Sequence, residues 1–313
     1  MKNYGGFEGN AQTFRIISKL GEYDVKCGLN LTRRAMLGVI KYPILYKKAI
    51  INKYGNKPPK CIYSSEQEVF KWLLKPFSKK DKNLFLSTKK NGKYNKSQYK
   101  TLDCSIMEMA DNIAYAIHDF EDAIKAKIIT KQIWDKVILK QIKPYKNFLN
   151  KNIKTKKKKK FVKFATKKLF NKDNKKSKAV FSKLINFFVT NTQIEKQDNK
   201  FACPILKYKV GFRHNKCKKI QQIINNLVCE KMIQRTENTQ LEIKGKRIVS
   251  KLYEAMLNAP KDILPKITYR KYKKSNYDKR VLSDYISGMT DNYAIKIYRR
   301  IFDASYGSTM DMI

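Results

Sequence analysis

The amino-acid sequence predicts an all-α protein. Apolar residues recur at spacings of three and four along most of its 313 residues, which is the period of an amphipathic helix. No run alternates apolar and polar residues convincingly enough to indicate a strand. Hydrophobic residues make up 42% of the chain and aromatic residues 12%, and this composition favours a globular protein with a buried core.

The first two helices are expected near the amino terminus. Apolar residues between Phe7 and Leu20 share one face, and Gly21 follows as a helix end. Residues 30–32 (Asn-Leu-Thr) supply side chains that can cap a second helix. That helix is expected to continue through Ile40 and to stop before Pro43.

The remaining elements follow in order. Ser65 with Glu68 three residues later resembles a capping box and predicts a short helix through Leu74. Residues 78–99 are rich in Lys, Asn and Ser, and we expect a loop or an insertion there. Residues 102–127 form the longest expected helix, with an apolar stripe of Ile106, Met109, Ala110, Ile113, Ala114, Ile117 and Phe120. Further helices are expected at residues 130–142, 177–194, 215–234, 242–257 and 279–302.

The charge balance is strongly basic. The chain has 69 Lys and Arg against 26 Asp and Glu, and this net charge of +43 favours acidic partners such as phosphates or nucleic acid. The excess is mostly Lys and comes with abundant Asn, Ile and Tyr, as an AT-rich genome also encodes at tolerant surface positions. A solvated lysine surface and a dedicated nucleic-acid groove are therefore both open. In the densest run, residues 154–168 (KTKKKKKFVKFATKK), a solvated face is favoured, and a domain boundary is expected there.

Cysteine usage and hydropathy bear on the compartment. The six cysteines contain no C-x-x-C pair, so neither a zinc ribbon nor a disulfide framework is indicated. No stretch approaches the roughly 18 continuous apolar residues of a membrane span, and the first residues lack the apolar core of a signal peptide. We therefore expect a cytoplasmic protein with no membrane partner.

The helix expected at residues 102–127 carries the polar residues of most interest. Asp111, Tyr115 and Asp119 follow one another at intervals of four, so they share one face, at the border of the apolar stripe. Carboxylates at such an edge are costly unless they are paired, hydrogen-bonded or bound to a metal. Spacing alone favours the simpler interpretation, an amphipathic helix with an acidic rim.

The adjacent pair His118 and Asp119 does not by itself indicate a metal site. A His-Asp metal centre of the phosphohydrolase type needs further imidazoles, and the chain has only two histidines, His118 and His214. His214 lies in a basic segment (GFRHNKCKK) with no carboxylate nearby in sequence. Three imidazoles cannot be assembled from this chain.

Four ordered motifs resemble the bacterial deoxyguanosine triphosphate triphosphohydrolase family, a branch of the HD-domain phosphohydrolases. They are GGFEGNAQTFRI (residues 5–16), GLNLTRRAMLGVIKYP (28–43), MEMADNIAYAIHDFEDAI (107–124) and DYISGMTDNYA (284–294). The resemblance implies a partial HD domain over residues 1–150. It also implies a basic lysine-rich connection over 151–176 and a helical phosphohydrolase-associated domain over 177–313.

The resemblance also implies a reaction and a substrate site. Family members hydrolyse a deoxynucleoside triphosphate, dGTP in particular, to the deoxynucleoside and inorganic triphosphate, with a divalent metal (Mg or Mn) held by two histidines and two aspartates. Asp111 matches the last of these metal ligands. Tyr115 and Asp119 match residues that line the sugar pocket, where the ring excludes a 2′-hydroxyl and the carboxylate accepts the 3′-hydroxyl. His118 does not match the family's His-Asp motif.

Further positions match the surroundings of the substrate. Lys41 and Tyr42 match residues near the triphosphate, where a lysine supplies positive charge. The polar members of the first motif, Asn10, Gln12 and Arg15, are expected to support the pocket, with a purely structural role as the alternative. For Asp291 a helix cap or a loop hydrogen bond is favoured. The glycines of the first motif do not match a phosphate-binding loop.

The sequence departs from the family before its first motif. Relatives carry there the first histidine, the His-Asp pair and a glycine- and histidine-rich segment with the catalytic histidine and acid, whereas this chain begins only a few residues upstream. Three of four metal ligands are absent, so no catalytic residue is assigned and Asp111 alone is expected to hold a metal weakly. We expect an incomplete triphosphohydrolase, inactive alone. The alternatives are a non-catalytic partner of a full-length paralogue, in a homo- or hetero-oligomer, a basic nucleic-acid-binding protein, and a functionless fragment.

Overall fold

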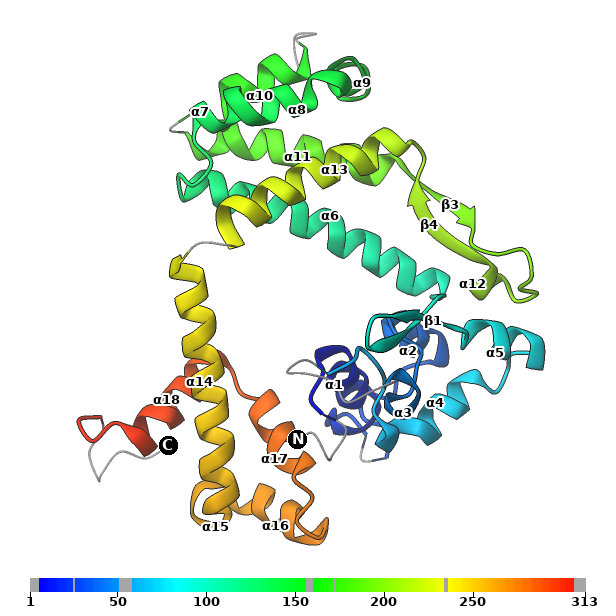
Figure 1. Ribbon diagram of the computed structural model, residues 1–313, viewed down its shortest axis with the longest axis vertical. Coiled ribbons are helices and arrows are strands. Elements are labelled where there is room, and N and C mark those ends of the chain that lie inside the picture. The colour runs from blue at the N-terminus through cyan, green and yellow to red at the C-terminus, as the bar shows by residue number, and fades with distance from the viewer. Residues whose placement is uncertain are drawn as a thin grey trace.

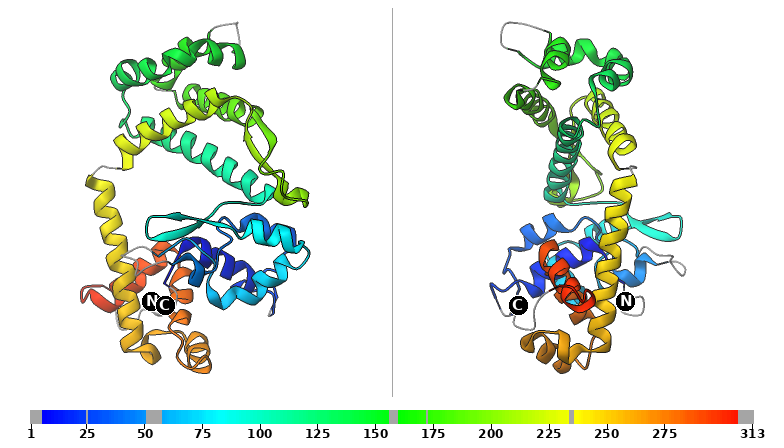
Figure 2. Two further views of the ribbon diagram at one scale, coloured as in Figure 1. Left: turned by 45° about the vertical axis from the view of Figure 1, so that its right-hand side comes forward. Right: turned by 90° about the vertical axis from the view of Figure 1, so that its left-hand side faces the viewer.

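Helices dominate the computed structural model, which describes residues 6–24, 26–50, 58–155, 160–171, 173–233 and 236–306. The predicted helical class is therefore confirmed. An amino-terminal lobe, a central helical bundle and a carboxy-terminal group of helices make up the chain (Figure 1). The long helix α14 connects the bundle to the carboxy-terminal group, and the helix α6 leads from the amino-terminal lobe into the bundle (Figures 1 and 2).

The amino-terminal lobe begins with two capped helices. The carboxylate of Glu8 accepts the amide of Ala11 at the start of α1, and the hydroxyl of Thr32 accepts the amide of Ala35 at the start of α2. Gly21 follows the π-helical turn η2, so the predicted end of the first helix is confirmed. The helical elements of the lobe are α1 (Gly9–Arg15), η2 (Ile16–Leu20), α2 (Arg33–Val39), α3 (Tyr46–Ala49), η3 (Ser64–Glu66), α4 (Gln67–Leu74) and α5 (Lys79–Phe85).

The predicted capping box is wrong. The hydroxyl of Ser65 donates to the carboxylate of its neighbour Glu66 at 2.9 Å, and Ser65 lies inside the 3-10 turn η3. The helix α4 starts after this turn with no side-chain cap. Glu68 instead pairs with Lys71 on the exposed surface. The 3-10 turn carries Glu66 into the interior of the lobe, where the side chain is buried.

The expected loop at residues 78–99 is also wrong, because it contains a helix and a hairpin. Ser78 caps α5 by accepting the amide of Asp81. Strands β1 (Thr88–Asn91) and β2 (Tyr94–Ser97) then pair in antiparallel register. Gly92 adopts a φ of +59°, which suits the tight turn between the strands. All four residues of β1 are polar or charged, so the strand shows no alternation of apolar and polar residues that could have predicted it.

Helix α6 (Leu102–Lys125) is shared between the lobe and the bundle. Thr101 caps it, and its first turns pack on α2, while the rest packs on α11 and α13. The buried side chains Ile113, Ile117 and Phe120 confirm the central part of the predicted stripe. Ile106, Ala110 and Ala114 are exposed, so the stripe begins later and runs on through Ala116, Ala123 and Ile124. The amino-terminal half of α6 therefore presents a large accessible face.

The central bundle contains the largest hydrophobic core. It joins the second half of α6 to the helices that follow, with Phe120, Trp134, Phe181 and Phe187 among its buried rings. Its helical elements are α7 (Lys131–Ile133), η4 (Trp134–Ile138), α8 (Leu139–Ile142), η5 (Lys143–Tyr145), α9 (Lys146–Asn152), α10 (Phe161–Leu169), α11 (Asn174–Thr190), α12 (Pro204–Lys207), α13 (Asn215–Val228) and η7 (Cys229–Ile233). Of the lysine-rich run 154–168, residues 156–159 lie outside the described residues and residues 161–168 belong to α10.

A second hairpin connects the bundle back to the lobe. Strands β3 (Thr192–Lys196) and β4 (Tyr208–Phe212) pair in antiparallel register, so the expectation of no strands is wrong here too. In the connection between them, the amides of Ala202 and Cys203 each donate to the buried carboxylate of Asp81 at 3.0 Å. The hairpin is thereby held against the amino-terminal lobe.

The carboxy-terminal group has its own small core around Leu252, Met256 and Leu282. It comprises α14 (Thr236–Asn258), α15 (Pro260–Ile263), α16 (Lys266–Lys274), α17 (Arg280–Ser287) and α18 (Asp291–Phe302). The single helix expected at residues 279–302 is broken after Ser287. The hydroxyl of Thr290, not the side chain of Asp291, caps α18 by accepting the amide of Tyr293. The capping role expected for Asp291 is therefore wrong.

Among the described helices, none is both long and apolar enough to cross a membrane. All six cysteines are unpaired. The division of the chain into domains at residues 150 and 176 stays a prediction.

Candidate functional site

The exposed face of α6 brings together the three residues expected to bind metal and sugar. Asp111 is exposed, Tyr115 keeps 47% of its surface accessible and Asp119 is half-buried. The phenol of Tyr115 lies near the carboxylate of Asp119, one turn later on the helix. Partial burial and the charge of Asp119 raise the pKa of Tyr115, so its phenol stays protonated and available as a donor. Cys229, at the end of α13, also contributes to the surroundings of Tyr115.

A lysine from each flank meets Glu108 at the amino-terminal half of α6. Lys41, just after α2, lies 3.4 Å from one carboxylate oxygen of Glu108, and Lys100 donates to the other. Burial alone would raise the pKa of Glu108, but Lys100 and Lys41 hold it below its usual value. Burial likewise opposes the charge of Lys41, yet Glu108, Tyr42 and Asp111 raise its pKa. The structure thus places Lys41 in the field of Asp111, one turn along α6.

A polar cleft opens beside this ion pair. Its volume is about 210 Å³, and it lies between the first turns of α6 and strand β4. Lys100, Glu108 and Asn112 line one side, and Gln197 and Lys209 line the other. The cleft therefore places two ammonium groups and three amide side chains (Gln98, Asn112 and Gln197) around Glu108.

Tyr42, which follows Lys41 in sequence, packs on a small apolar cluster. It packs against the cluster of Ala11, Ile44, Ala49, Cys61 and Tyr63. Lys60 donates to its hydroxyl at 3.2 Å and lies 5.1 Å from the centre of its ring. Tyr42 and Lys60 together form a positively charged edge of the amino-terminal lobe.

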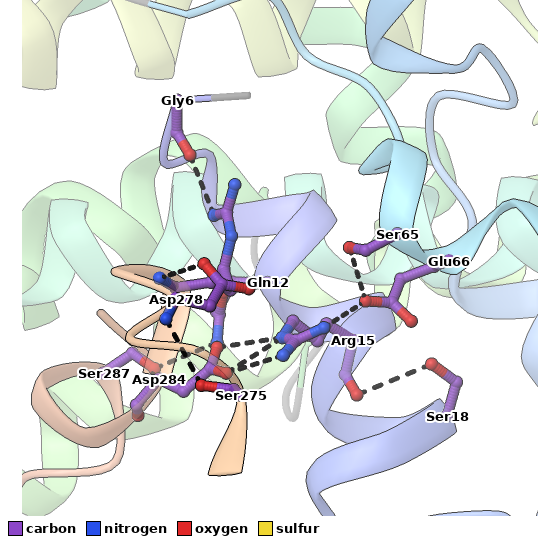
Figure 3. A network of polar contacts seen from close by, with 11 residues as sticks. Gly6, Gln12, Arg15, Ser18, Ser65, Glu66, Ser275, Asp278, Asp284 and Ser287 are labelled. Carbon is purple, nitrogen blue, oxygen red and sulfur yellow. Dashed lines mark hydrogen bonds and ion pairs between the residues drawn. The ribbon is translucent and has the colours of Figure 1, made fainter. Parts of the chain in front are cut away.

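Arg15 and Gln12 on α1 are buried in a polar network that reaches the carboxy-terminal group (Figure 3). Arg15 donates through Nε and Nη2 to both carboxylate oxygens of Asp284 at 2.8–3.0 Å, and through Nη1 to Glu66. Gln12 donates through Nε2 to Asp284 at 2.9 Å and to the hydroxyl of Ser287 at 3.1 Å. Desolvation opposes the charge of Arg15, but its two carboxylate partners raise its pKa, so it remains cationic.

A second arginine also links the first motif to the carboxy-terminal group, and this one lies on α17. Arg280 on α17 donates to the carbonyl of Gly6 at 2.8 Å and lies 4.0 Å from the centre of the Tyr63 ring. Tyr63 in turn accepts the amide of Glu8 at its hydroxyl. Asn10 contributes only locally, by donating to the Glu8 carboxylate at 2.7 Å. The first motif and α17 therefore form one hydrogen-bonded unit.

Gln12 retains an unused acceptor. Its Oε1 atom is buried and has no hydrogen-bond partner among the described residues. The support of the pocket by Asn10, Gln12 and Arg15 stays a prediction, as do the site roles of the other matched residues.

Sequence reasoning did not assign four residues that hold this region together: Glu66, Lys100, Glu108 and Asp284. Asp284 opens the fourth motif, so a family pattern marked its segment but not its partner. Glu108 lies three residues before Asp111 on α6, and this spacing could have predicted that the two side chains share a helical face. Glu66 has no local signal, because its partner Arg15 comes from a distant segment, and Lys100 meets Glu108 only because the chain turns into α6 between them.

The described residues do not by themselves fit the metal centre that the resemblance implies. No group of three or more His, Cys, Asp and Glu side chains among them is placed to share an ion. Of the two histidines, His118 is exposed beside Asp119, and His214 packs its ring 5.4 Å from that of Phe148 in the bundle. Asp111 alone supplies one oxygen-donor side chain, and a divalent ion requires several.

Comparisons with known proteins agree with the motifs. A family profile described as the phosphohydrolase-associated domain matches residues 213–300. A deoxyguanosinetriphosphate triphosphohydrolase-like protein 2 of Deinococcus radiodurans is 38% identical over 327 residues, which cover 100% of this chain and 72% of the relative.

Two further relatives share the same description. Deoxyguanosinetriphosphate triphosphohydrolase-like proteins of Histophilus somni and Shewanella halifaxensis are 34% and 35% identical. These matches cover 96% and 100% of this chain, and 69% and 72% of the relatives. At this identity and coverage, the chain belongs to the family of deoxyguanosinetriphosphate triphosphohydrolase-like proteins.

Proposed function

We propose that this chain binds a deoxynucleoside triphosphate, dGTP in particular, on the exposed face of α6 and takes part in its hydrolysis to deoxynucleoside and inorganic triphosphate. The observation that carries the proposal is the placement of Tyr115 beside Asp119 on that face, with Asp111 one turn earlier. The family of the chain supports the same substrate class. The unpaired cysteines agree with a cytoplasmic location, which we also propose.

The residues of α6 divide the work of recognition. Asp119 accepts the 3′-hydroxyl of the sugar, and the ring of Tyr115 packs on the deoxyribose so that a 2′-hydroxyl has no room. Tyr115 and Asp119 lie on consecutive turns of one face of α6, so both side chains can contact the same sugar. Lys41 lies on the side of Asp111 and supplies positive charge to the phosphates, and Lys100 adds a second ammonium group.

The described residues do not complete a metal site, and we derive no step through a metal. In this family a divalent ion polarises the phosphoryl group and orients the attacking water. Asp111 is the residue of this chain that would contribute to such an ion. The part of the function that this chain carries by itself is therefore binding and sugar discrimination.

The test compares dGTP with GTP by isothermal titration calorimetry. The two nucleotides carry the same charge, so attraction to the basic surface cancels in the ratio of their affinities. We expect at least a tenfold preference for dGTP. Tyr115→Ala should remove most of it because the ring no longer excludes the 2′-hydroxyl. Asp119→Asn should weaken the binding of both nucleotides because both carry the 3′-hydroxyl that the carboxylate accepts. Asp122→Asn, an exposed aspartate on the same helix, is the matched control.

Two results would contradict the proposal. Equal affinity for dGTP and GTP in the unaltered chain would show that α6 does not recognise the sugar. An equal loss of affinity in the Asp119 and Asp122 variants would show that only the acidic rim matters.

A further inference from the structure

Positive charge is concentrated in one segment of the central bundle. Residues 131–171 contain fifteen lysines and a single acidic residue, Asp135. This stretch, about an eighth of the chain, holds about a third of its net charge of +43. A lysine bias spread evenly over tolerant surface positions does not produce such a concentration. The segment therefore calls for an explanation of its own.

Parts of this segment that the structure describes form a groove. Helices α7, α8 and α9 with the turn η5 form one wall, and α10 forms the other, around a volume of about 540 Å³. Five exposed lysines line it: Lys131, Lys143, Lys146, Lys163 and Lys167. Leu139, Ile142 and Val162 provide the apolar part of the lining, and no acidic side chain contributes. We call this feature the lysine groove.

Most of these lysines keep their charge available. Lys131 pairs with Asp135 at 3.0 Å on the exposed surface. Lys143, Lys146, Lys163 and Lys167 form no ion pair with any residue that the structure describes. Neighbouring like charges without counter-ions repel one another, so an anionic ligand that spans them is stabilised by all four.

The groove offers little for reading a sequence. Thr166 is its only hydroxyl, and that group already accepts a hydrogen bond from Trp134 Nε1 and donates one to the carbonyl of Val162. The lysine ammonium groups contact phosphates as point charges, without a preference for particular bases. An apolar surface between them can pack against sugars and unpaired bases.

We propose that the lysine groove binds the phosphate backbone of single-stranded nucleic acid without sequence preference. A charged groove that follows successive phosphates is the usual basis of such binding. The groove lies in the part of the bundle farthest from α15 and α16, and it shares no lining residue with the cleft beside α6 (Figure 1). The proposal is therefore independent of nucleotide binding on α6.

The test uses a fluorescein-labelled oligothymidine of about 20 nucleotides and fluorescence anisotropy at several salt concentrations. The groove variant replaces Lys143, Lys146, Lys163 and Lys167 with alanine. The control variant replaces four exposed lysines of α16 (Lys266, Lys271, Lys273 and Lys274) with alanine, so both variants lose the same net charge. Circular dichroism melting checks that both stay folded.

We expect the groove variant to bind at least tenfold more weakly near 0.1 M salt, while the control stays within about threefold of the unaltered chain. Each phosphate contact on a single strand contributes about 0.7 to the slope of log K against log salt, so the slope should fall by up to about 3 in the groove variant. The control should keep its slope almost unchanged.

Four outcomes would overturn the proposal. Equal losses of oligonucleotide affinity in the two variants would show that binding depends on net charge and not on the groove. A duplex of the same length that binds more tightly than the single strand, with the same dependence on the groove, would assign the groove to duplex. If inorganic tripolyphosphate displaced the labelled oligonucleotide at concentrations as low as those at which the oligonucleotide binds, the groove would be a site for small polyphosphates. Binding of phosphatidylserine vesicles, but not of the oligonucleotide, through the groove would assign it to a membrane surface.

Discussion

The guanidinium of Arg15 on α1 and the carboxylate of Asp284 on α17 form a two-pronged contact between residues 269 positions apart in sequence. Both side chains are almost fully buried, and the remaining guanidinium nitrogen of Arg15, Nη1, forms an ion pair with Glu66. Because α17 belongs to the carboxy-terminal group, this contact fixes that group against the first motif of the chain. Arg280 adds a second tie between the same elements.

The buried pair predicts a large loss of stability on substitution. We expect Asp284→Asn to lower the free energy of unfolding by about 3–5 kcal/mol, because it leaves Arg15 without its main counter-charge in the interior. The double variant Arg15→Gln with Asp284→Asn should lose less than the sum of the single losses. Urea denaturation followed by circular dichroism measures all three.

The exposed pair of Arg34 and Asp103 is the matched control. It has the same residue types and a similar two-pronged geometry, but Arg34 lies in solvent. Arg34→Gln should therefore change stability far less than Arg15→Gln. Similar losses for the two arginines would show that burial of the Arg15 network contributes nothing.

Asp81 predicts a second, more local effect. Its buried carboxylate accepts the amides of Ala202 and Cys203, and an alanine at this position leaves both donors unsatisfied. We expect Asp81→Ala to cost about 2–4 kcal/mol and to speed hydrogen exchange at those two amides. Asp81→Asn retains one acceptor and should cost less. Unchanged exchange in the alanine variant would contradict the proposed attachment of the second hairpin.

Glu108 predicts a dependence of stability on pH. Its pKa in the folded chain is lowered by Lys100 and Lys41 from the usual value near 4.5, so the unfolded chain binds the proton more readily. The stabilisation that the ionised Glu108 carboxylate gives to the folded chain is therefore complete above about pH 4.5. It is lost as the pH falls through the lowered pKa of the folded chain. Glu108→Gln should reduce the melting temperature at pH 7, with the difference disappearing near pH 3.

Glu68 provides the control for this pH dependence. It pairs with Lys71 on an exposed surface, and both side chains are more than half accessible. Glu68→Gln should leave the melting temperature nearly unchanged at both pH values. A difference for Glu108→Gln that stayed constant down to pH 3 would mean that its charge is not the cause.

The ligand set predicts the catalytic behaviour of the isolated chain. Asp111 is the single matched metal ligand, and the described residues form no group of three ligating side chains. We expect no release of triphosphate from dGTP with magnesium or manganese. Addition of a family segment that carries the missing histidines, as a separate polypeptide, should restore release if the two pieces fit. Metal-dependent release by the chain alone that Asp111→Ala abolishes would disprove this prediction.

Much of the fold was predictable because helices are encoded locally. The caps Thr32 and Thr101, the terminator Gly21 and the apolar period of α6 all act within a few residues of the element that they define. The first hairpin was missed because its strands are short and polar. The second was missed because the apolar alternation of β4 (Tyr208, Val210 and Phe212) extends over only five residues. The turn of the first hairpin, Gly92-Lys93 with glycine at its first position, was a local signal that could have revealed it.

The candidate site was predictable in part. The spacing of Asp111, Tyr115 and Asp119 was sufficient to place them on one helical face, and four ordered motifs identified the family. Lys41 was assigned to the phosphates from a motif, but its partner Glu108 appeared only in the structure. The concentration of lysines was visible in the sequence, whereas their arrangement around a groove was not.

By itself, the sequence determined the helical class, the family and the polar face of α6. These depend on periodicity and on motifs, which are properties of short segments. The tertiary structure alone decided that Arg15 meets Asp284, that Glu108 lies between two lysines and that helices α8 and α10 enclose the lysine groove. Such contacts join residues whose separation in sequence carries no periodic signal, and they exist only once hydrophobic burial has packed the helices together.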